Sequence, residues 1–212
     1  MDHSFKRASK CRLWCFALLV AFCTAAVAQA QQPPRIYKIE EDWELVVSSP
    51  RAAIHSPQIS LYTTPDDSDP EAYFQLQLNY AAREDFSEGG FMVSAMRDET
   101  PVQEARSDVR ELLTHDGEQL RWTSVMAVIN NELLFAVKDG LGSNWGSFGG
   151  PDYIVRMPAR GLQHLDRYTP EKSLETVDVS FGANHVQSLV LTRVRAYYTD
   201  DQVVETVFDS NP

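Results

Sequence analysis

A glycine-rich loop from Gly142 to Gly150 carries the residues best suited to hold a ligand. Its sequence, GSNWGSFGG, places Trp145 and Phe148 among small residues, with Asn144 beside the indole. An indole face is an apolar platform on which a sugar ring can stack, and an amide supplies directional hydrogen bonds. Two alternatives are open. The two aromatic rings form an exposed ligand platform, or they fold back as a lid over one end of the core.

A second candidate surface lies on the segment Tyr73 to Tyr80, YFQLQLNY. Apolar and polar residues alternate in it, which predicts a half-buried strand of an antiparallel sheet. Gln75, Gln77 and Asn79 share the polar face, where their amides either bind sugar hydroxyls or form an ordinary solvent-exposed surface. The opposite face consists of Phe74, Leu76, Leu78 and Tyr80.

Carboxylates that could act as a catalytic pair are not recognisable. Glu40, Glu41 and Asp42 are consecutive, so we expect them to point in different directions. No G-x-S-x-G nucleophile elbow is present, and the glycine-rich loop lacks the G-K-[ST] of a phosphate loop. The sequence therefore predicts no catalytic residue. A further group of acids consists of Glu171, Glu175 and Asp178, but their spacing does not place them on one face of a strand.

Metal and cofactor sites are not expected either. The loop TTPDDSDPE, with acids from Asp66 to Glu71, is either a solvated acidic loop or a weak calcium site, and the sequence leaves this open. It lacks the glycine at the turn position of an EF-hand. The histidines His55, His115, His164 and His185 are isolated, without HExxH spacing.

Residues 1–30 predict a secretory signal peptide. Lys6, Arg7, Lys10 and Arg12 precede the uncharged run WCFALLVAFCTAAVA, and Ala28-Gln29-Ala30 supplies small residues for cleavage after Ala30. The run is shorter than the roughly 20 residues of a membrane-spanning helix. We expect a secreted or periplasmic protein with no membrane span after cleavage.

Cleavage would change both cysteine content and charge. The three cysteines, Cys11, Cys15 and Cys23, all lie in the leader, so the mature chain has no disulfide. The whole chain carries −11; removing four basic residues and one acid leaves 15 basic and 29 acidic residues, or −14. Such a domain repels nucleic acid and anionic membranes, so neither is an expected partner.

Strand patterns dominate after a short linker at residues 31–35. Runs rich in Val, Ile, Tyr, Phe and Trp alternate with Gly, Pro, Asp and Asn clusters, which is typical of antiparallel sheets. We expect a single all-β domain at residues 36–208, an antiparallel two-sheet β-sandwich, followed by a tail at 209–212. The other predicted strands are Trp43–Val47, Ile59–Thr63, Phe91–Met96, Tyr153–Met157 and Val186–Tyr198.

Three local features refine this expectation. Leu120 to Val137 reads as a hairpin turning at Asn130-Asn131, with its second strand ended by Asp139-Gly140. In the last long strand the apolar parity slips between Leu191 and Val194, which predicts a bulge or bend. The segment Val102 to Leu113 fits either a short helix or a strand with a charged outer face.

Together, the hairpin Trp122–Val137, the glycine-rich loop and the strand LVLTRVRAYY resemble the concanavalin A-like jelly roll. That superfamily includes legume-type lectins, laminin G-like modules and laminarinase-like glycosidases. The blocks GSNWGSFGG and SFGANHVQSLVL are also similar to secreted bacterial proteins of uncharacterised activity. The resemblance implies a jelly-roll sandwich. The E-x-D-x-x-E strand motif of its glycosidases is not found.

Three function hypotheses follow. The first is a non-catalytic extracellular module that binds an extracellular or envelope glycan. The second is a structural or interaction protein of the cell envelope without a small ligand. The third is a glycoside-active enzyme on a lectin-like scaffold. Fold alone does not choose among them, since one fold hosts many functions.

Overall fold

A computed structural model describes residues 32–49, 57–66, 69, 71–80, 89–107 and 113–208. The predicted signal peptide lies outside these residues and stays a prediction. The described residues from Pro34 onward belong to one compact unit. Among the described residues, no helix has the length and apolar character needed to cross a membrane.

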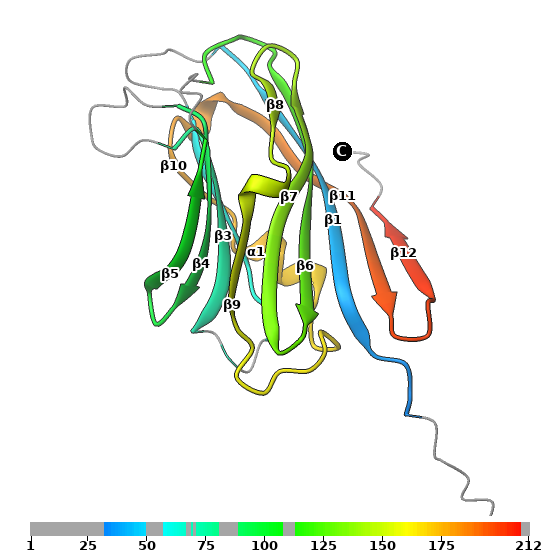
Figure 1. Cartoon of the computed structure of the whole chain (residues 1–212). Helices are drawn as coiled ribbons and strands as arrows, with labels where there is room; N and C mark the ends of the chain where they lie inside the picture. Colours follow the sequence, from blue (N-terminus) through cyan, green and yellow to red (C-terminus); the bar gives the residue numbers. More distant parts are fainter. Residues whose placement is uncertain are drawn as a thin grey trace, which may run out of the picture. The chain divides into compact units, whose positions relative to one another are not determined.

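The described part of the chain folds into two antiparallel sheets, one of seven strands and one of five (Figure 1). We call them the larger and the smaller sheet. This arrangement confirms the predicted antiparallel two-sheet β-sandwich. The larger sheet has the order β12-β11-β1-β6-β7-β8, with β9 also paired to β7. Its strands are β1 (Ile36–Val47), β6 (Gln119–Ile129), β7 (Glu132–Gly142), β8 (Gly146–Phe148), β9 (Ile154–Pro158), β11 (Val186–Tyr198) and β12 (Val203–Val207).

The smaller sheet has the order β10-β2-β3-β4-β5. Its strands are β2 (Gln58–Thr63), β3 (Ala72–Leu78), β4 (Phe91–Arg97), β5 (Thr100–Arg106) and β10 (Asp178–Phe181). The strand alternative for Val102 to Leu113 is therefore correct as far as Arg106, while residues 108–112 lie outside the described part. One helix, α1 (Pro170–Glu175), and two single 3₁₀ turns, Pro151–Tyr153 and Ala183–His185, complete the described elements.

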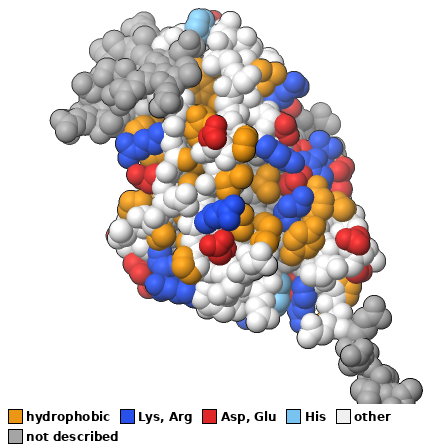
Figure 2. Space-filling view, in the orientation of Figure 1, with side chains coloured by type: hydrophobic (Ala, Val, Ile, Leu, Met, Phe, Trp, Pro, Cys, Tyr) orange, Lys and Arg blue, Asp and Glu red, His pale blue; other side chains and the backbone are white. Residues whose placement is uncertain are grey.

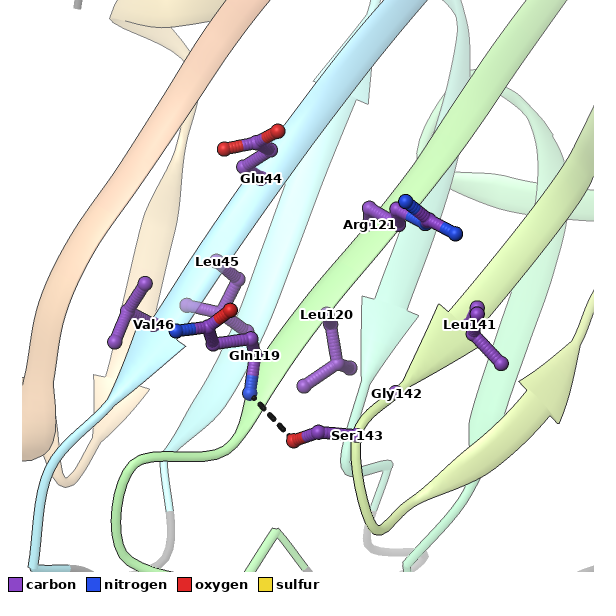
Figure 3. Close-up of a pocket in the computed structure, with 9 residues that line it drawn as sticks. All are labelled: Glu44, Leu45, Val46, Gln119, Leu120, Arg121, Leu141, Gly142 and Ser143. Atoms are coloured by element: carbon purple, nitrogen blue, oxygen red, sulfur yellow. Dashed lines mark hydrogen bonds between the residues drawn. The ribbon is translucent and has the colours of Figure 1, made fainter.

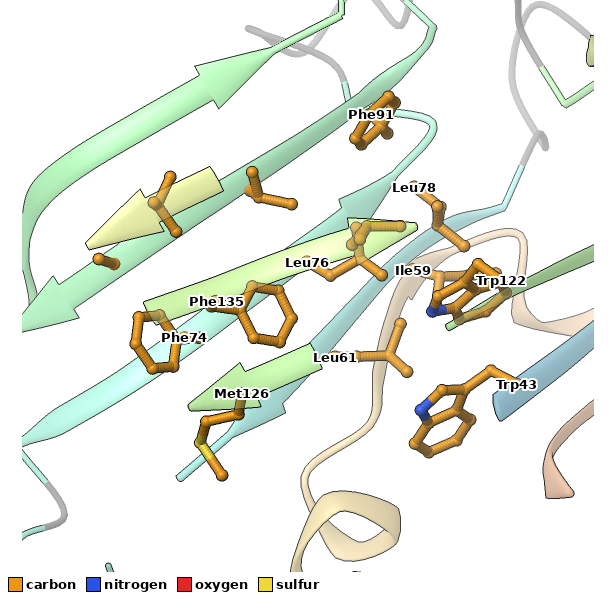
Figure 4. Close-up of a cluster of buried hydrophobic side chains, with 14 of the residues drawn as sticks. Trp43, Ile59, Leu61, Phe74, Leu76, Leu78, Phe91, Trp122, Met126 and Phe135 are labelled. Atoms are coloured by element: carbon orange, nitrogen blue, oxygen red, sulfur yellow. The ribbon is translucent and has the colours of Figure 1, made fainter. Parts of the chain in front are cut away.

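Apolar side chains from the facing sides of the two sheets form the core. In β3, buried and half-buried residues alternate along the whole strand, as the sequence predicts. Phe74 of β3 stacks on Phe135 of β7 with ring centroids 5.2 Å apart, and this contact joins the two sheets. Figure 4 shows these rings together with Leu76, Leu78 and the indoles of the larger sheet. The core is thus built by period-two patterning on both sheets.

The β6–β7 hairpin turns where the sequence predicts. Asn130 and Asn131 have φ values of 52° and 66°, the left-handed values of a two-residue type I′ turn. The predicted end of the second strand at Asp139-Gly140 is wrong. β7 continues to Gly142, and Asp139 and Gly140 instead form a bulge opposite Trp122. A turn-forming dipeptide also suits a bulge, because both need left-handed backbone, and Asp139 has a φ of 56°.

A second bulge confirms the predicted parity slip in β11. Asp42 of β1 pairs with Arg193 and Trp43 pairs with Leu191, so Thr192 is the extra residue. The two bulges lie on either side of the central pair β1–β6. They set which side chains reach the outer face there.

Candidate functional site

The outer face of the larger sheet collects charged residues from β1. Glu40, Asp42 and Glu44 alternate along the strand and face outward, whereas Glu41 and Trp43 face the core. The expectation from the consecutive acids was incomplete, because it compared neighbours and overlooked the i, i+2 relation that puts Glu40, Asp42 and Glu44 on one face. Extending the strand back from Trp43 to Ile36 would have revealed it.

Glu40 is locked in an ionic network. Its Oε1 accepts hydrogen bonds from the Nζ atoms of Lys38 and Lys138 at 3.1 and 2.9 Å. Its Oε2 accepts from Arg195 at 3.1 Å and from the Tyr197 hydroxyl at 2.9 Å. Burial acts to raise the pKa of Glu40, but these hydrogen bonds outweigh burial and lower the pKa to about 2. The carboxylate is therefore ionised, and both of its oxygens already accept hydrogen bonds from side chains of the same sheet.

Asp42 is held in the same way. It accepts from Arg193 Nε at 2.7 Å, from Arg195 at 2.8 Å and from the Thr123 hydroxyl at 2.7 Å. Burial acts to raise the pKa of Asp42, and the hydrogen bonds and nearby guanidinium groups lower it overall. A glycosidase pair needs one carboxyl whose pKa is raised so that it can act as an acid. Glu40 and Asp42 both have lowered pKa values, so neither fits the role of that acid.

Two adjoining cavities lie on this face, between the two bulges. We call them together the outer groove. The smaller has a volume of about 270 Å³ and lies over the ends of β1, β6 and β7. The larger has a volume of about 620 Å³ and extends to β11. Both are lined by Glu44, Arg121 and Leu141, so they form one continuous groove. Figure 3 shows these three side chains rising from neighbouring strands.

Three charged side chains of the groove, Glu44, Arg121 and Asp139, have no partner among the described residues. Glu44 and Arg121 stand directly opposite each other on β1 and β6, and both are exposed. Neither side chain has a hydrogen bond or ion pair with any residue in the described part of the chain. Beside them Leu141 is 41% exposed. The arrangement offers guanidinium donors, carboxylate acceptors and an apolar surface within one groove.

The predicted platform at Trp145 is wrong. Trp145 is only 8% exposed and belongs to the core, with its ring centroid 5.4 Å from that of Phe148. Phe148 in turn contacts Phe91 of the smaller sheet at 5.4 Å. The lid alternative is therefore the correct one, because the two rings close one end of the sandwich. Asn144 remains exposed beside them.

A buried carboxylate missed at the sequence level fixes this loop. Glu118 is 1% exposed, and its Oε1 accepts the backbone N–H groups of Asn144 and Trp145 at 2.8 and 2.9 Å. A Cβ on Gly142 would come within 2.7 Å of the same oxygen, so the close approach requires glycine. Glu118 thereby shapes the wall of the smaller cavity, which Gly142 and Ser143 line.

The amides predicted to share one sheet face are not equivalent. Gln75 and Gln77 are half-buried on the outer face of the smaller sheet and donate to the Tyr62 and Ser60 hydroxyls at 3.2 and 3.4 Å. Asn79 follows β3, has a φ of 54° and is 2% exposed. Its amide donates to the Pro57 carbonyl and accepts from the Leu113 N–H. The prediction that Asn79 reads sugar hydroxyls is therefore wrong, because left-handed backbone turns it inward.

The other candidate residues do not gather into a site. In the acidic loop, Asp66 pairs with Arg167 at 3.5 Å and Asp69 with Arg97 at 3.4 Å, while Asp67 and Ser68 lie outside the described residues. No cluster of three or more His, Cys, Asp or Glu side chains suited to a metal ion occurs among the residues with described positions. Glu171 and Glu175 lie on α1 and Asp178 on β10. His55 lies outside the described part.

Comparisons with known proteins find similarity only in structure. No protein-family model matches the chain, and no curated protein matches it. The ancestral congerin Con-anc aligns with 77% of this chain and 95% of its own length, at 12% identity and a TM-score of 0.36. Chicken galectin 2 aligns with 76% of this chain and 98% of its own, at 14% identity and a TM-score of 0.33.

Ligand-free congerin I covers 83% of this chain and 96% of its own length, at 14% identity and a TM-score of 0.32. The identities and TM-scores of these three structures are low, so they carry no argument about this chain, whose fold is defined by its own two sheets.

Proposed function

We propose that the chain is an exported, non-catalytic binding domain whose ligand is a glycan held in the outer groove. The observation that carries this proposal is the opposed pair Glu44 and Arg121, which is exposed where the two cavities meet and has no partner among the described residues. A carbohydrate hydroxyl both donates and accepts hydrogen bonds. It can therefore bridge a carboxylate and a guanidinium that do not bridge each other.

The rest of the groove supports the same ligand class. Leu141 presents an apolar surface to the C–H face of a sugar ring, and Ser147 adds a hydroxyl to the lining. Ligand sites commonly combine apolar walls with a few fixed polar groups in volumes of about 300–1,000 Å³. The ion pairs around Asp42 hold the floor in place before a ligand arrives, which reduces the entropy cost of binding.

Glycan-array screening of the purified domain from Pro34 onward tests the proposal. We expect binding that Arg121→Ala and Glu44→Ala each weaken by at least tenfold. Arg156→Ala is the matched control, since Arg156 is an exposed arginine on β9 that pairs with Glu132 and lies outside the groove lining. Equal binding by all four proteins would contradict the assignment to the groove. Loss of binding in Gln75→Ala alone would place the glycan site on the smaller sheet instead.

Non-catalytic action has its own test. Any glycan that binds is incubated with the domain, and new reducing ends are measured. We expect none, because Glu40 and Asp42 are ion-paired and have lowered pKa values, so neither fits the role of the acid. Release of reducing ends that is abolished in Glu44→Gln would instead support the glycoside-active hypothesis.

A second candidate function is an interaction protein of the cell envelope without a small ligand. The observation that favours it is β12, an edge strand whose Val203, Val204 and Val207 are 51%, 49% and 65% exposed. Exposed apolar edges can accept a further strand from a partner. Failure of every glycan in the array, together with retention of an envelope protein that Val204→Lys abolishes, would favour this candidate.

A further inference from the structure

We infer that the ligand of the outer groove is an uncharged oligosaccharide that spans both cavities. This inference rests on the proposed function and specifies its substrate class. The charge balance of the groove indicates that the ligand is uncharged. The way in which the two cavities join indicates that the ligand is several sugars long.

The lining of the larger cavity carries three acids and three bases. Two of the bases, Arg193 and Arg195, already bond to Asp42 at 2.7 and 2.8 Å, and Arg195 also contacts Glu40. Charges that neutralise each other inside the groove are not available to a ligand. The charges of the lining without a partner among the described residues are Glu44, Asp139 and Arg121.

These three groups alternate in sign across the strands. Arg121 pairs directly with Glu44 of β1 on one side and with Leu141 of β7, two residues beyond Asp139, on the other. An anionic sugar near Arg121 would lie close to two carboxylates, and a cationic sugar near either carboxylate would lie close to Arg121, which stands between them. Like charges brought together at an interface oppose binding. Neutral hydroxyls can bond to both signs without that repulsion.

The visible face of the molecule has the same mixed character. Figure 2 shows basic, acidic and hydrophobic side chains interspersed, without a large area of one sign. Electrostatic attraction of a highly charged polymer would need such an area. The chain as a whole carries −11, which also opposes an acidic polysaccharide.

The length of the ligand follows from the residues that line both cavities. Glu44, Arg121 and Leu141 stand at the junction of the cavities, so a sugar held there reaches toward both. One cavity extends toward Val46 and Ser143, the other toward Thr192 and Arg195. A single sugar at the junction would leave most of both cavities unfilled. A chain of several sugars would fill them and gain contacts at each end.

Calorimetric titration with chemically matched series tests both features. The probes are neutral cello-, manno- and galacto-oligosaccharides of one to five residues, oligogalacturonates and chitosan oligomers, each at low and high salt. We expect affinity for one neutral series to rise at least tenfold from one to four residues and to change less than twofold with salt. A monosaccharide that binds as tightly as the tetrasaccharide would contradict the inference that the ligand spans both cavities. Tighter binding of oligogalacturonate or chitosan would contradict the inference that the ligand is uncharged.

A variant that fills the smaller cavity separates length from general damage. Gln119 is exposed and lines that cavity, so Gln119→Trp should remove the gain from added sugars and retain the affinity for short ones. Gln202→Trp, at the exposed turn between β11 and β12, is the matched control and should change neither. A full length gain in Gln119→Trp would contradict the inference. Absence of binding to every glycan would instead contradict the proposed function.

Discussion

Glu40 and Glu41 are neighbours in sequence with opposite environments. Glu40 faces outward into a network of cations, which lowers its pKa to about 2. Glu41 faces the core at 2% exposure and accepts hydrogen bonds from Tyr168, Ser173 and Trp43 at 2.6, 2.6 and 3.0 Å. Burial raises the pKa of Glu41 despite these three donors. One step along a strand therefore reverses the effect of pH on a carboxylate.

The two residues predict stability changes of opposite sign. The native state binds the Glu41 proton more tightly than the unfolded chain, so its contribution is full below pH 4.5 and is lost as pH rises through the raised pKa. Relative to Glu41→Gln, the natural protein should lose stability as pH rises above 4.5. Urea unfolding across a pH series measures this difference.

Glu40→Gln is the control of opposite sign. Its carboxylate stabilises the fold above pH 4.5, and this contribution is lost as pH falls toward about 2. The natural protein should therefore gain stability over Glu40→Gln as pH rises from about 2 to 4.5. The same pH trend in both variants would show that the two environments are wrongly assigned.

Trp145 lies in the core, so we expect its substitution to lower the stability of the fold. Trp145→Ala should destabilise the domain by about 3–5 kcal/mol, because a buried ring is lost beside Phe148. Denaturant unfolding measures the loss. Asn144→Ala is the neighbouring control and should cost at most about 0.5–1.5 kcal/mol, since Asn144 is exposed and its backbone N–H keeps the bond to Glu118. Similar costs for the two would place the indole outside the core.

At the scale of elements, β3 follows its sequence pattern and β7 departs from it. β3 alternates from Ala72 to Leu78, so the side chains from Tyr73 to Leu78 lie on their predicted faces, whereas Asn79 and Tyr80 lie beyond the strand. β7 continues beyond Asp139-Gly140 by means of a bulge. Gly140 lies so close to Phe148 that a Cβ there would come within 2.3 Å of the Phe148 carbonyl oxygen. The glycine therefore serves the pairing of β7 with β8 rather than the end of a strand.

Substitutions in β3 measure its register. Leu76→Ala should cost about 2–5 kcal/mol, because Leu76 is 1% exposed between the two sheets. Gln75→Ala should cost about 0.5–1.5 kcal/mol, the net value of its hydrogen bond to Tyr62. Thermal or denaturant unfolding gives both values. A larger cost for Gln75 than for Leu76 would mean that the strand faces are exchanged.

At the scale of the whole molecule, export is the prediction to check. Mass spectrometry of the exported protein should find Gln31 as the first residue, since Ala28 and Ala30 provide the small residues of the cleavage site. Such a protein has no cysteine, and its melting temperature should be the same with and without dithiothreitol. An intact segment 1–30 in a membrane fraction would contradict cleavage.

The sequence alone determined the sandwich class and most of the longer strands with their inward faces, whereas β8, β10, β12 and the first half of β1 were not predicted. Period-two alternation is a local property, and so is the pairing of two asparagines in the β6–β7 turn. The bulge in β11 could also be predicted, because the alternation of apolar residues along that strand shifts by one position. Each of these features depends on residues adjacent in the chain.

Only the tertiary structure decided where the candidate site lies. The groove combines β1, β6, β7 and β11, and its opposed residues Glu44 and Arg121 are separated by 77 positions in sequence. The burial of Trp145 likewise depends on Phe148 and, through it, on Phe91 of the other sheet. Whether a charged or aromatic side chain is available to a ligand depends on neighbours brought together by sheet pairing and packing, which local patterns do not encode.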